Sequence, residues 1–367
     1  MKILIAPNAY KGYISSLEAS RIIYSLLKKN LPGAELKIYP VSDGGDGFLE
    51  CLHYHFNYRP DHILLDDITG RKRKIIYLTD NNGSAFIELA EISGIRLFDR
   101  IVPEAGKLAL DSMGRLIGEL YKRGYKRLYL GIGGSATNDC GAGILRGMGF
   151  RFYDSGGNEI TGEKDIVQLL SRTSSVKNPG TFNDLEINVY CDVNNRLLGS
   201  YGSTRVYGPQ KSISVKCMGL WEKAHRHYAQ ILAFNAGKRF YDRRYFGSAG
   251  GAGVSLFYIF KTVFHNGSDI FLNNAFKKHF SDSNIVITGE GRLDSTSFSC
   301  KAPGRIIRMA EKHDKCLIFL SGSSEHIQFD SHIHIYENKK AVRTRPEAIK
   351  ELSNNLKKAI IDITGGI

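Results

Sequence analysis

Residues that could bind a phosphate group and a metal ion gather in one stretch, Gly131–Gly143, which reads GIGGSATNDCGAG. Its glycines let the backbone approach a ligand closely, and hydroxyl, amide and carboxylate groups follow at Ser135, Thr137, Asn138 and Asp139. The flanking residues predict a buried strand at 127–130 and a helix at 142–148. A glycine-rich turn between strand and helix presents backbone N–H groups to an anion. The stretch fits a phosphorylated ligand with a metal, and equally a tight turn with Asp139 as N-cap.

Other loops add charged side chains that phosphoryl transfer would need. Asp43 and Asp192 each follow a predicted strand and are candidates for a metal ligand or a base, with loop capping as the alternative. Glu290 and Asp294 could hold Mg2+, which favours one or two carboxylates plus phosphate oxygens. The candidate cations are Lys11 for a substrate carboxylate or phosphate, Arg292 for a bidentate carboxylate contact, and Lys211 and Lys301 for phosphates. Arg292 could instead pair with Glu290 or Asp294, and the lysines could be exposed.

The predicted elements divide the chain into two domains. A strand at 2–6, a helix from Ser15 or Ser16 to about 29 and a strand at 36–41 form a βαβ unit, which implies parallel strands. Strands and helices alternate again after 266, including a predicted helix at 269–279 and strands at 284–288 and 316–320. Between them lie short alternating strands separated by turns, and a helix predicted from 247–253 to about 263. We therefore predict an α/β fold in which residues 61–265 are inserted into a domain of residues 1–60 and 266–367, with the ligand cleft between the domains.

Composition excludes several other classes. The 367 residues are 42% hydrophobic and 24% charged, which is typical of a globular chain. No apolar run is long enough to span a bilayer, and the N-terminal MKILIAPNAYKG predicts a first strand rather than a signal peptide. The six cysteines form no C-x-x-C pair, so we expect reduced thiols in the cytoplasm and no zinc site. The net charge of +13 raises the alternative of nucleic-acid binding, but no motif that reads DNA or RNA accompanies it.

The glycine-rich and carboxylate-bearing motifs together resemble those of the type I glycerate kinases. The motifs occur in that family's order from Met1 to about Ser323: APNAYKG, VSDGGDG, GIGGSATNDCGAG, CDVNN, YGPQK, GSAGGAG and ITGEGRLD. The resemblance implies ATP-dependent phosphorylation of D-glycerate, usually to 2-phosphoglycerate, with Mg2+, and a Rossmann-like first domain. The expected partners are glycerate and a nucleotide, with no nucleic acid and no membrane, in a monomer or homodimer.

The expected phosphoryl donor is ATP, and each candidate site residue has an expected role in its binding or in the transfer. We expect Asp192, Lys11 and Arg292 to be catalytic, Asp192 as the base, and Asp43, Glu290 and Asp294 to bind the metal. The nucleotide is expected at Gly133, Gly134, Ser135, Ala136, Thr137, Asn138, Lys211, Gly250 and Gly251. His225 and His227, on a polar helix, are expected at the surface.

The chain departs from the family pattern in three motifs. Asn8-Ala9-Tyr10 stands for the usual Asp-Ser-Phe, Asp46 for the usual Glu, and Asn194 for the usual Asp. Two carboxylates of the pattern are therefore amides. An alternative function follows, in which the protein binds a nucleotide or an organic acid without turnover.

Overall fold

Two compact units make up the chain. The computed structural model describes residues 1–10, 12–98, 102–298, 301–325, 327–338 and 340–365. The first unit joins Met1–His55 to Asn266–Ile367, and the second unit is the intervening segment Phe56–His265. We expected the first boundary between the two units near residue 60, and in the structure it falls after His55. The predicted α/β class, with one unit inserted into the other, is confirmed.

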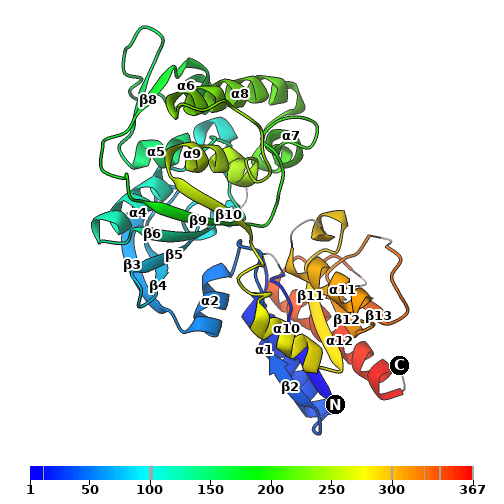
Figure 1. Cartoon of the computed structure of the whole chain (residues 1–367). Coiled ribbons are helices and arrows are strands. Elements are labelled where there is room, and N and C mark those ends of the chain that lie inside the picture. Colours follow the sequence, from blue (N-terminus) through cyan, green and yellow to red (C-terminus); the bar gives the residue numbers. More distant parts are fainter. Residues whose placement is uncertain (11, 99–101, 299–300, 326, 339, 366–367) are drawn as a thin grey trace. The chain divides into compact units, whose positions relative to one another are not determined.

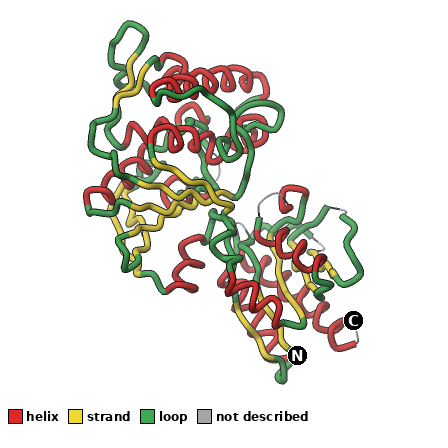
Figure 2. The backbone as a smooth tube through the Cα atoms, in the orientation of Figure 1, coloured by secondary structure: helices red, strands yellow, loops and turns green. Residues whose placement is uncertain are grey.

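A five-stranded parallel sheet in the order β13–β12–β11–β1–β2 forms the centre of the first unit. Strands alternate with helices along this unit (Figures 1 and 2). The strands are β1 (Lys2–Ile5), β2 (Glu35–Ile38), β11 (Ile285–Glu290), β12 (Cys316–Ser321) and β13 (Ile333–Glu337). The helices are α1 (Ser16–Asn30), α2 (Phe48–Phe56, which ends across the division), α10 (Asn274–Asp282), α11 (Ala302–Lys312) and α12 (Arg345–Gly365).

Apolar side chains are buried on both faces of this sheet. Ile3 and Ile5 of β1 pack in the core shared with α1 and α12, and Leu4 between them is also fully buried. Helix α10 contacts β1, and α11 contacts β11 and β12. A parallel sheet covered by helices buries both sets of side chains, which explains why its strands read as continuous apolar runs.

The strand order reverses direction beside β1. The chain passes from β1 to β2 on one side, and later returns to β11 on the other side and continues through β12 to β13. In open α/β sheets, ligands bind outside the carboxyl ends of the strands at such a point. The loops that leave β1 and β11 carry Asn8 and residues 291–294, so these residues lie at the expected ligand-binding edge.

The second unit contains a six-stranded mixed sheet in the order β10–β9–β6–β5–β4–β3. The pairs β3–β4 and β4–β5 are antiparallel, and β5–β6 and β6–β9 are parallel. The strands are β3 (Arg59–Asp66), β4 (Lys72–Thr79), β5 (Ser84–Glu88), β6 (Arg127–Gly131), β9 (Glu186–Cys191) and β10 (Lys261–Asn266), with a separate hairpin of β7 (Arg151–Tyr153) and β8 (Ser175–Lys177).

Helices cover the mixed sheet in layers. Figure 1 shows α5 and α9 over the strands, with α6 and α8 beyond them. The helices of this unit are α3 (Ala90–Ser93), α4 (Asp111–Lys122), α5 (Ala142–Gly147), α6 (Ile166–Arg172), α7 (Ser203–Tyr207), α8 (Met218–Asn235) and α9 (Ala252–Ile259). Short 3-10 turns complete the elements: η1 (Ile95–Leu97), η2 (Ala105–Lys107), η3 (Pro209–Lys211), η4 (Val215–Cys217) and η5 (Ser248–Gly251) here, and η6 (Ser295–Phe298) in the first unit. None of the described helices combines the length and apolarity needed to cross a membrane.

Two predicted helices have different bounds in the structure. The helix predicted up to about 263 is wrong beyond Ile259, because Phe260 is extended and β10 follows, where β-branched Thr262 and Val263 favour a strand. The helix predicted from 269 begins at Asn274 instead. The Asn273 side chain accepts hydrogen bonds from the backbone N–H groups of Ala275 and Phe276, so it fixes the N-terminus of α10 there.

Two glycine-rich loops of the second unit pack directly against each other. The Cys140 N–H donates to the Gly250 carbonyl at 3.0 Å. Gly250 has a φ of +66°, and a Cβ placed on it would lie 2.0 Å from the Thr137 carbonyl oxygen. Gly251 has a φ of +93°, and a Cβ placed on it would lie 2.8 Å from the Cys140 sulfur. Both glycines are therefore required by backbone conformation and by the closeness of the 133–139 loop.

We expect Gly250→Ala to destabilise the second unit by about 2–5 kcal/mol, because left-handed strain of about 1–2 kcal/mol adds to an overpacking cost of about 1–3 kcal/mol. The chain has one tryptophan, Trp221, which is buried in the second unit, so urea unfolding followed by its fluorescence reports on this unit. Gly237→Ala is the matched control: its φ is +65° and nothing lies within 4 Å of the added Cβ. Equal losses in the two variants would show that the loop contact contributes nothing.

Candidate functional site

In the first unit, Asp43 connects two parts of the ligand-binding edge. The Asp43 side chain is buried, and its Oδ1 accepts the backbone N–H of Ala302, the first residue of α11, at 2.6 Å. Its Oδ2 accepts from the Asn8 side-chain amide at 2.5 Å. A carboxylate at a helix N-terminus is stabilised by the helix dipole and by the unpaired N–H groups there. Asn8 therefore gives Asp43 a hydrogen-bond donor and adds no second negative charge.

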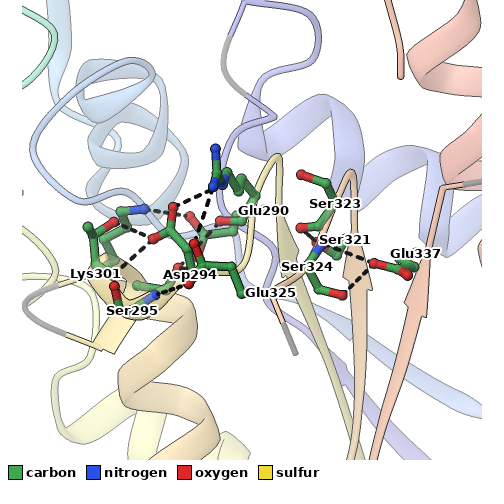
Figure 3. A network of polar contacts seen from close by, with 12 residues as sticks. Glu290, Asp294, Ser295, Lys301, Ser321, Ser323, Ser324, Glu325 and Glu337 are labelled. Carbon is green, nitrogen blue, oxygen red and sulfur yellow. Dashed lines mark hydrogen bonds and ion pairs between the residues drawn. The ribbon is translucent and has the colours of Figure 1, made fainter. Parts of the chain in front are cut away.

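Glu290 and Lys301 form a largely buried ion pair beside Asp43. Glu290 is the last residue of β11, and its Oε2 lies 3.2 Å from the Lys301 Nζ. The exposed fractions of the two side chains are 6% and 14%. Lys301 directly precedes Ala302, which binds Asp43, so consecutive residues at the start of α11 hold both carboxylates. Figure 3 shows Glu290, Asp294 and Lys301 gathered at this place.

Asp294 and Arg292 mainly stabilise their own loop. The Asp294 Oδ1 accepts from the backbone N–H and the hydroxyl of Thr296. Burial raises the pKa of Asp294, but the Thr296 hydrogen bonds and the nearby charges of Lys301 and Arg292 bring it below its ordinary value. Arg292, with 64% of its side chain exposed, pairs with Asp294 and with Glu325 at 3.2 Å each. The pair with Asp294 is the alternative considered for Arg292 from the sequence, whereas the pair with Glu325 was not anticipated.

In the second unit, Asp139 organises the glycine-rich loop from within. Its side chain is fully buried and accepts backbone N–H groups of Leu110, Gly141 and Gly143 at 2.9–3.1 Å. Burial raises the pKa of Asp139, and these hydrogen bonds oppose the rise. Asp139 is not the N-cap of α5, since Gly141 occupies that position. The carboxylate therefore uses N–H groups at the start of the helix that an anion would otherwise find.

Lys211 fixes the same loop from the other side. Its ammonium group is buried and donates to the Thr137 carbonyl at 2.7 Å. Burial lowers the pKa of Lys211 to about 8, against the opposing effects of Asp139 and Asp192. Lys211 is thus mostly charged at neutral pH. Asp192, which follows β9, is close enough to act on it electrostatically, so the structure brings Asp192 and Lys211 to the same loop.

A closed cycle of hydrogen bonds surrounds Asn138. The Asn138 amide donates to the Thr204 hydroxyl at 3.1 Å, and that hydroxyl lies 3.4 Å from His225 Nδ1. His225 Nε2 lies 2.9 Å from the Asn138 carbonyl, so this nitrogen carries the proton and Nδ1 accepts. The Asn138 Oδ1 is buried and has no hydrogen-bond partner within the described residues. This oxygen is therefore an unsatisfied acceptor that is enclosed by the protein.

The structure groups the predicted site residues into two sets. In the second unit the loop residues Gly133, Gly134, Ser135, Ala136, Thr137 and Asn138 lie with Lys211, Gly250, Gly251 and Asp192. In the first unit Asp43, Glu290, Asp294, Arg292 and Lys301 lie together. Lys11, the remaining predicted catalytic residue, lies outside the described residues.

The expected surface position of His225 is wrong, because this side chain is fully buried. The spacing of His225 from apolar residues of the same helix indicates that it is buried. His225 lies four residues after Trp221 and three before Tyr228, on the apolar stripe of α8. Thr204 and the pairing of Asn8 with Asp43 were also missed, and no sequence pattern indicates these long-range contacts.

We expect the second unit to lose stability as the pH falls from about 6.5 toward 4. Burial lowers the pKa of His225 to about 4 from its ordinary value of 6.5. Between these values the unfolded chain binds a proton that the folded chain does not, so acidification favours unfolding, by up to about 3 kcal/mol. The measurement is the Tm from Trp221 fluorescence between about pH 7 and pH 4.5.

Two variants of α8 separate His225 from other titrating groups. His225→Gln should flatten the dependence of Tm on pH, whereas His227→Gln should retain the wild-type dependence, since His227 is only partly buried and lies next to the Thr173 carbonyl. An unchanged slope in His225→Gln would assign the acid sensitivity to other residues.

The chain is similar to known proteins along most of its length. The model of the Glycerate kinase family matches residues 3–366. The chain is 33% identical over 327 residues to the glycerate kinase of Bacillus subtilis (strain 168), which covers 88% of this chain and 85% of that protein. It is 32% identical over 329 residues to the glycerate 2-kinase of Escherichia coli (strain K12), with 88% and 85% covered.

A solved structure has the same fold along the whole chain. It is the crystal structure of a protein assigned as glycerate kinase 2 from Salmonella typhimurium LT2, with a TM-score of 0.79 and 29% identity, covering 100% of this chain and 97% of that one. The resemblance found from the motifs is therefore confirmed, and this chain belongs to the glycerate kinase family.

Proposed function

We propose that this protein transfers a phosphoryl group from ATP to the 2-hydroxyl of D-glycerate and forms 2-phosphoglycerate. Membership of the family gives the class, a kinase that acts on a hydroxyl of glycerate. The observation that carries the choice of the 2-position is the similarity to the Escherichia coli protein named glycerate 2-kinase. We propose a cytoplasmic location, which the reduced thiols expected from the sequence suggest.

We assign the metal ligands to the first unit. Asp43 and Glu290 are carboxylates held by consecutive residues of α11, which suits Mg2+ bound through one or two carboxylates and substrate phosphates. Within the described residues, no group of three or more His, Cys, Asp or Glu side chains could hold a metal alone. A magnesium ion here would therefore need phosphate oxygens, and it would offset charge that develops on the transferred group. Asp294, the third ligand expected from the sequence, accepts hydrogen bonds from Thr296 within its own loop, so we do not propose it as a direct ligand.

The second unit supplies the proposed base and the contacts to phosphate oxygens. Asp192 would accept the proton of the attacking hydroxyl, and Lys211, charged below a pKa of about 8, would draw negative charge toward the loop. Residues 133–138 with Gly250 and Gly251 form a loop pair whose conformation is fixed by packing before a ligand arrives. A site fixed in advance stabilises transition-state charge without reorganisation. Lys11 and Arg292 are proposed to contact the acceptor or a phosphate.

The alternative function is binding without turnover, which the amides at Asn8 and Asn194 suggested. The Asn8 amide donates a hydrogen bond to Asp43, so the amide at this position supports the carboxylate that we propose as a metal ligand. This observation favours a catalytic protein over a degenerate binder.

Purified protein with ATP, Mg2+ and D-glycerate should release ADP in a glycerate-dependent manner. We expect 31P and 13C NMR of the product to show the phosphate on carbon 2. ATP hydrolysis in the absence of glycerate is the control. Folded protein that binds ADP but shows no glycerate-dependent turnover would support binding without catalysis, and phosphate on carbon 3 would contradict the assigned position.

Substitution of the two carboxylates that follow strands should separate base from metal ligand. Asp192→Asn should lower kcat by about 10²–10⁴-fold, because a general base contributes on that order. Asp43→Asn should lower activity in a manner that excess Mg2+ partly restores, whereas Asp192→Asn should not respond to Mg2+.

Stability must be measured in both variants. Asp43 caps α11, so its substitution is expected to cost about 1 kcal/mol or somewhat more, visible in the Tm by circular dichroism. A near-normal kcat in either variant would show that the residue has a structural role and no catalytic one.

A further inference from the structure

A cavity of about 400 Å³ lies in the first unit at the carboxyl ends of its strands. Residues that end or follow four neighbouring strands line it, in the order of the sheet: Tyr10 after β1, Glu290 on β11, Ser321 on β12 and Asn338 after β13. Its volume falls within the range typical of small-molecule sites. The cavity therefore occupies the edge at which the strand order predicts a ligand.

The lining changes character from one side of the sheet to the other. Charged groups come from the end of β11 and the start of α11, namely Glu290, Arg292 and Lys301. Toward β13, the lining is apolar and comes from α12 and the segment before it, with Val342 and Leu352. A ligand with an apolar body and a charged extension matches this division.

The cavity also offers fixed polar groups among its apolar walls. The buried Asn355 amide donates to the Asn338 Oδ1 at 2.9 Å, which holds the Asn338 side chain in place. Within the described residues the Asn338 Nδ2 has no acceptor of its own, so it can donate to a ligand. The Tyr10 hydroxyl donates to the Leu320 carbonyl at 2.8 Å and ties the β1 loop to β12. Few, well-placed polar groups in an apolar pocket determine ligand orientation.

We infer that this cavity binds the nucleoside part of ATP. The inference rests on the proposed function, which involves two substrates. Every carbon of glycerate carries oxygen, so this small acid gains little from the apolar walls and would leave most of the volume unfilled. Adenosine presents a flat ring with acceptor nitrogens to the apolar walls and to Asn338. Lys301 and Arg292 then lie on the side where the phosphates would extend.

Filling the cavity from its exposed rim tests the assignment without disturbing the core. Ala341 lines the cavity and is exposed, so Ala341→Trp adds a large side chain at the rim of the cavity. We expect the KM for ATP to rise at least about tenfold, with the KM for glycerate unchanged. Ile361→Trp is the control, because Ile361 is 67% exposed on α12 and does not line the cavity.

The outcomes separate this inference from the proposed function. An unchanged KM for ATP in Ala341→Trp, or a rise confined to the KM for glycerate, would overturn the nucleoside assignment while leaving the kinase intact. If the wild type shows no turnover, the proposed function fails. Binding of ADP, measured by calorimetry, then tests the nucleoside assignment by itself. Loss of ADP binding in Ala341→Trp but not in Ile361→Trp would then support the assignment. Equal ADP affinity in all three proteins, or none in the wild type, would refute it.

Discussion

The arrangement of the second unit depends on one buried cation. Placing the Lys211 ammonium group in the interior carries a desolvation cost, which the lowered pKa reflects. The cost is offset by its hydrogen bond to the Thr137 carbonyl and by attraction to Asp139 and Asp192. These partners belong to two different loops, so the cation keeps them at fixed positions. The glycine at position 250 then becomes obligatory, because the backbone that Lys211 holds leaves no room for a Cβ.

In the first unit, the buried charged groups that need partners are carboxylates. Its strand ends bring Asp43 and Glu290 to the start of α11, where Ala302 and Lys301 respectively bind them. A helix N-terminus and one lysine together balance two carboxylates that are almost inaccessible to water. A metal ion that bound there would have to compete with Lys301 for Glu290. Any phosphate oxygens that arrived with the metal would give Lys301 a new partner, which makes that exchange reasonable.

Much of the fold and part of the site were predictable from the sequence. Local signals were sufficient where they act over a few residues: Ser15 caps α1, and the apolar run before Gly131 is β6. The start of α9 could not be predicted, because the left-handed Gly250 before it packs against the distant Thr137 carbonyl. The motifs identified Asp43 and Glu290 as site candidates. Their joint attachment to α11 depends on contacts between residues far apart in the chain, which no local pattern contains.

Glycines of the GIGGSATNDCGAG and GSAGGAG motifs have an explanation in packing. A Cβ on Gly143 would lie 2.3 Å from the Leu110 backbone nitrogen and 2.7 Å from Asp139, and one on Gly250 would meet the Thr137 carbonyl. Asp139 and Lys211 already occupy donors and acceptors of this loop. A ligand that contacts this loop therefore meets a rigid backbone with few unpaired groups. In this unit the glycine-rich sequence builds a rigid scaffold first, and any phosphate contact depends on the groups that the scaffold leaves unused.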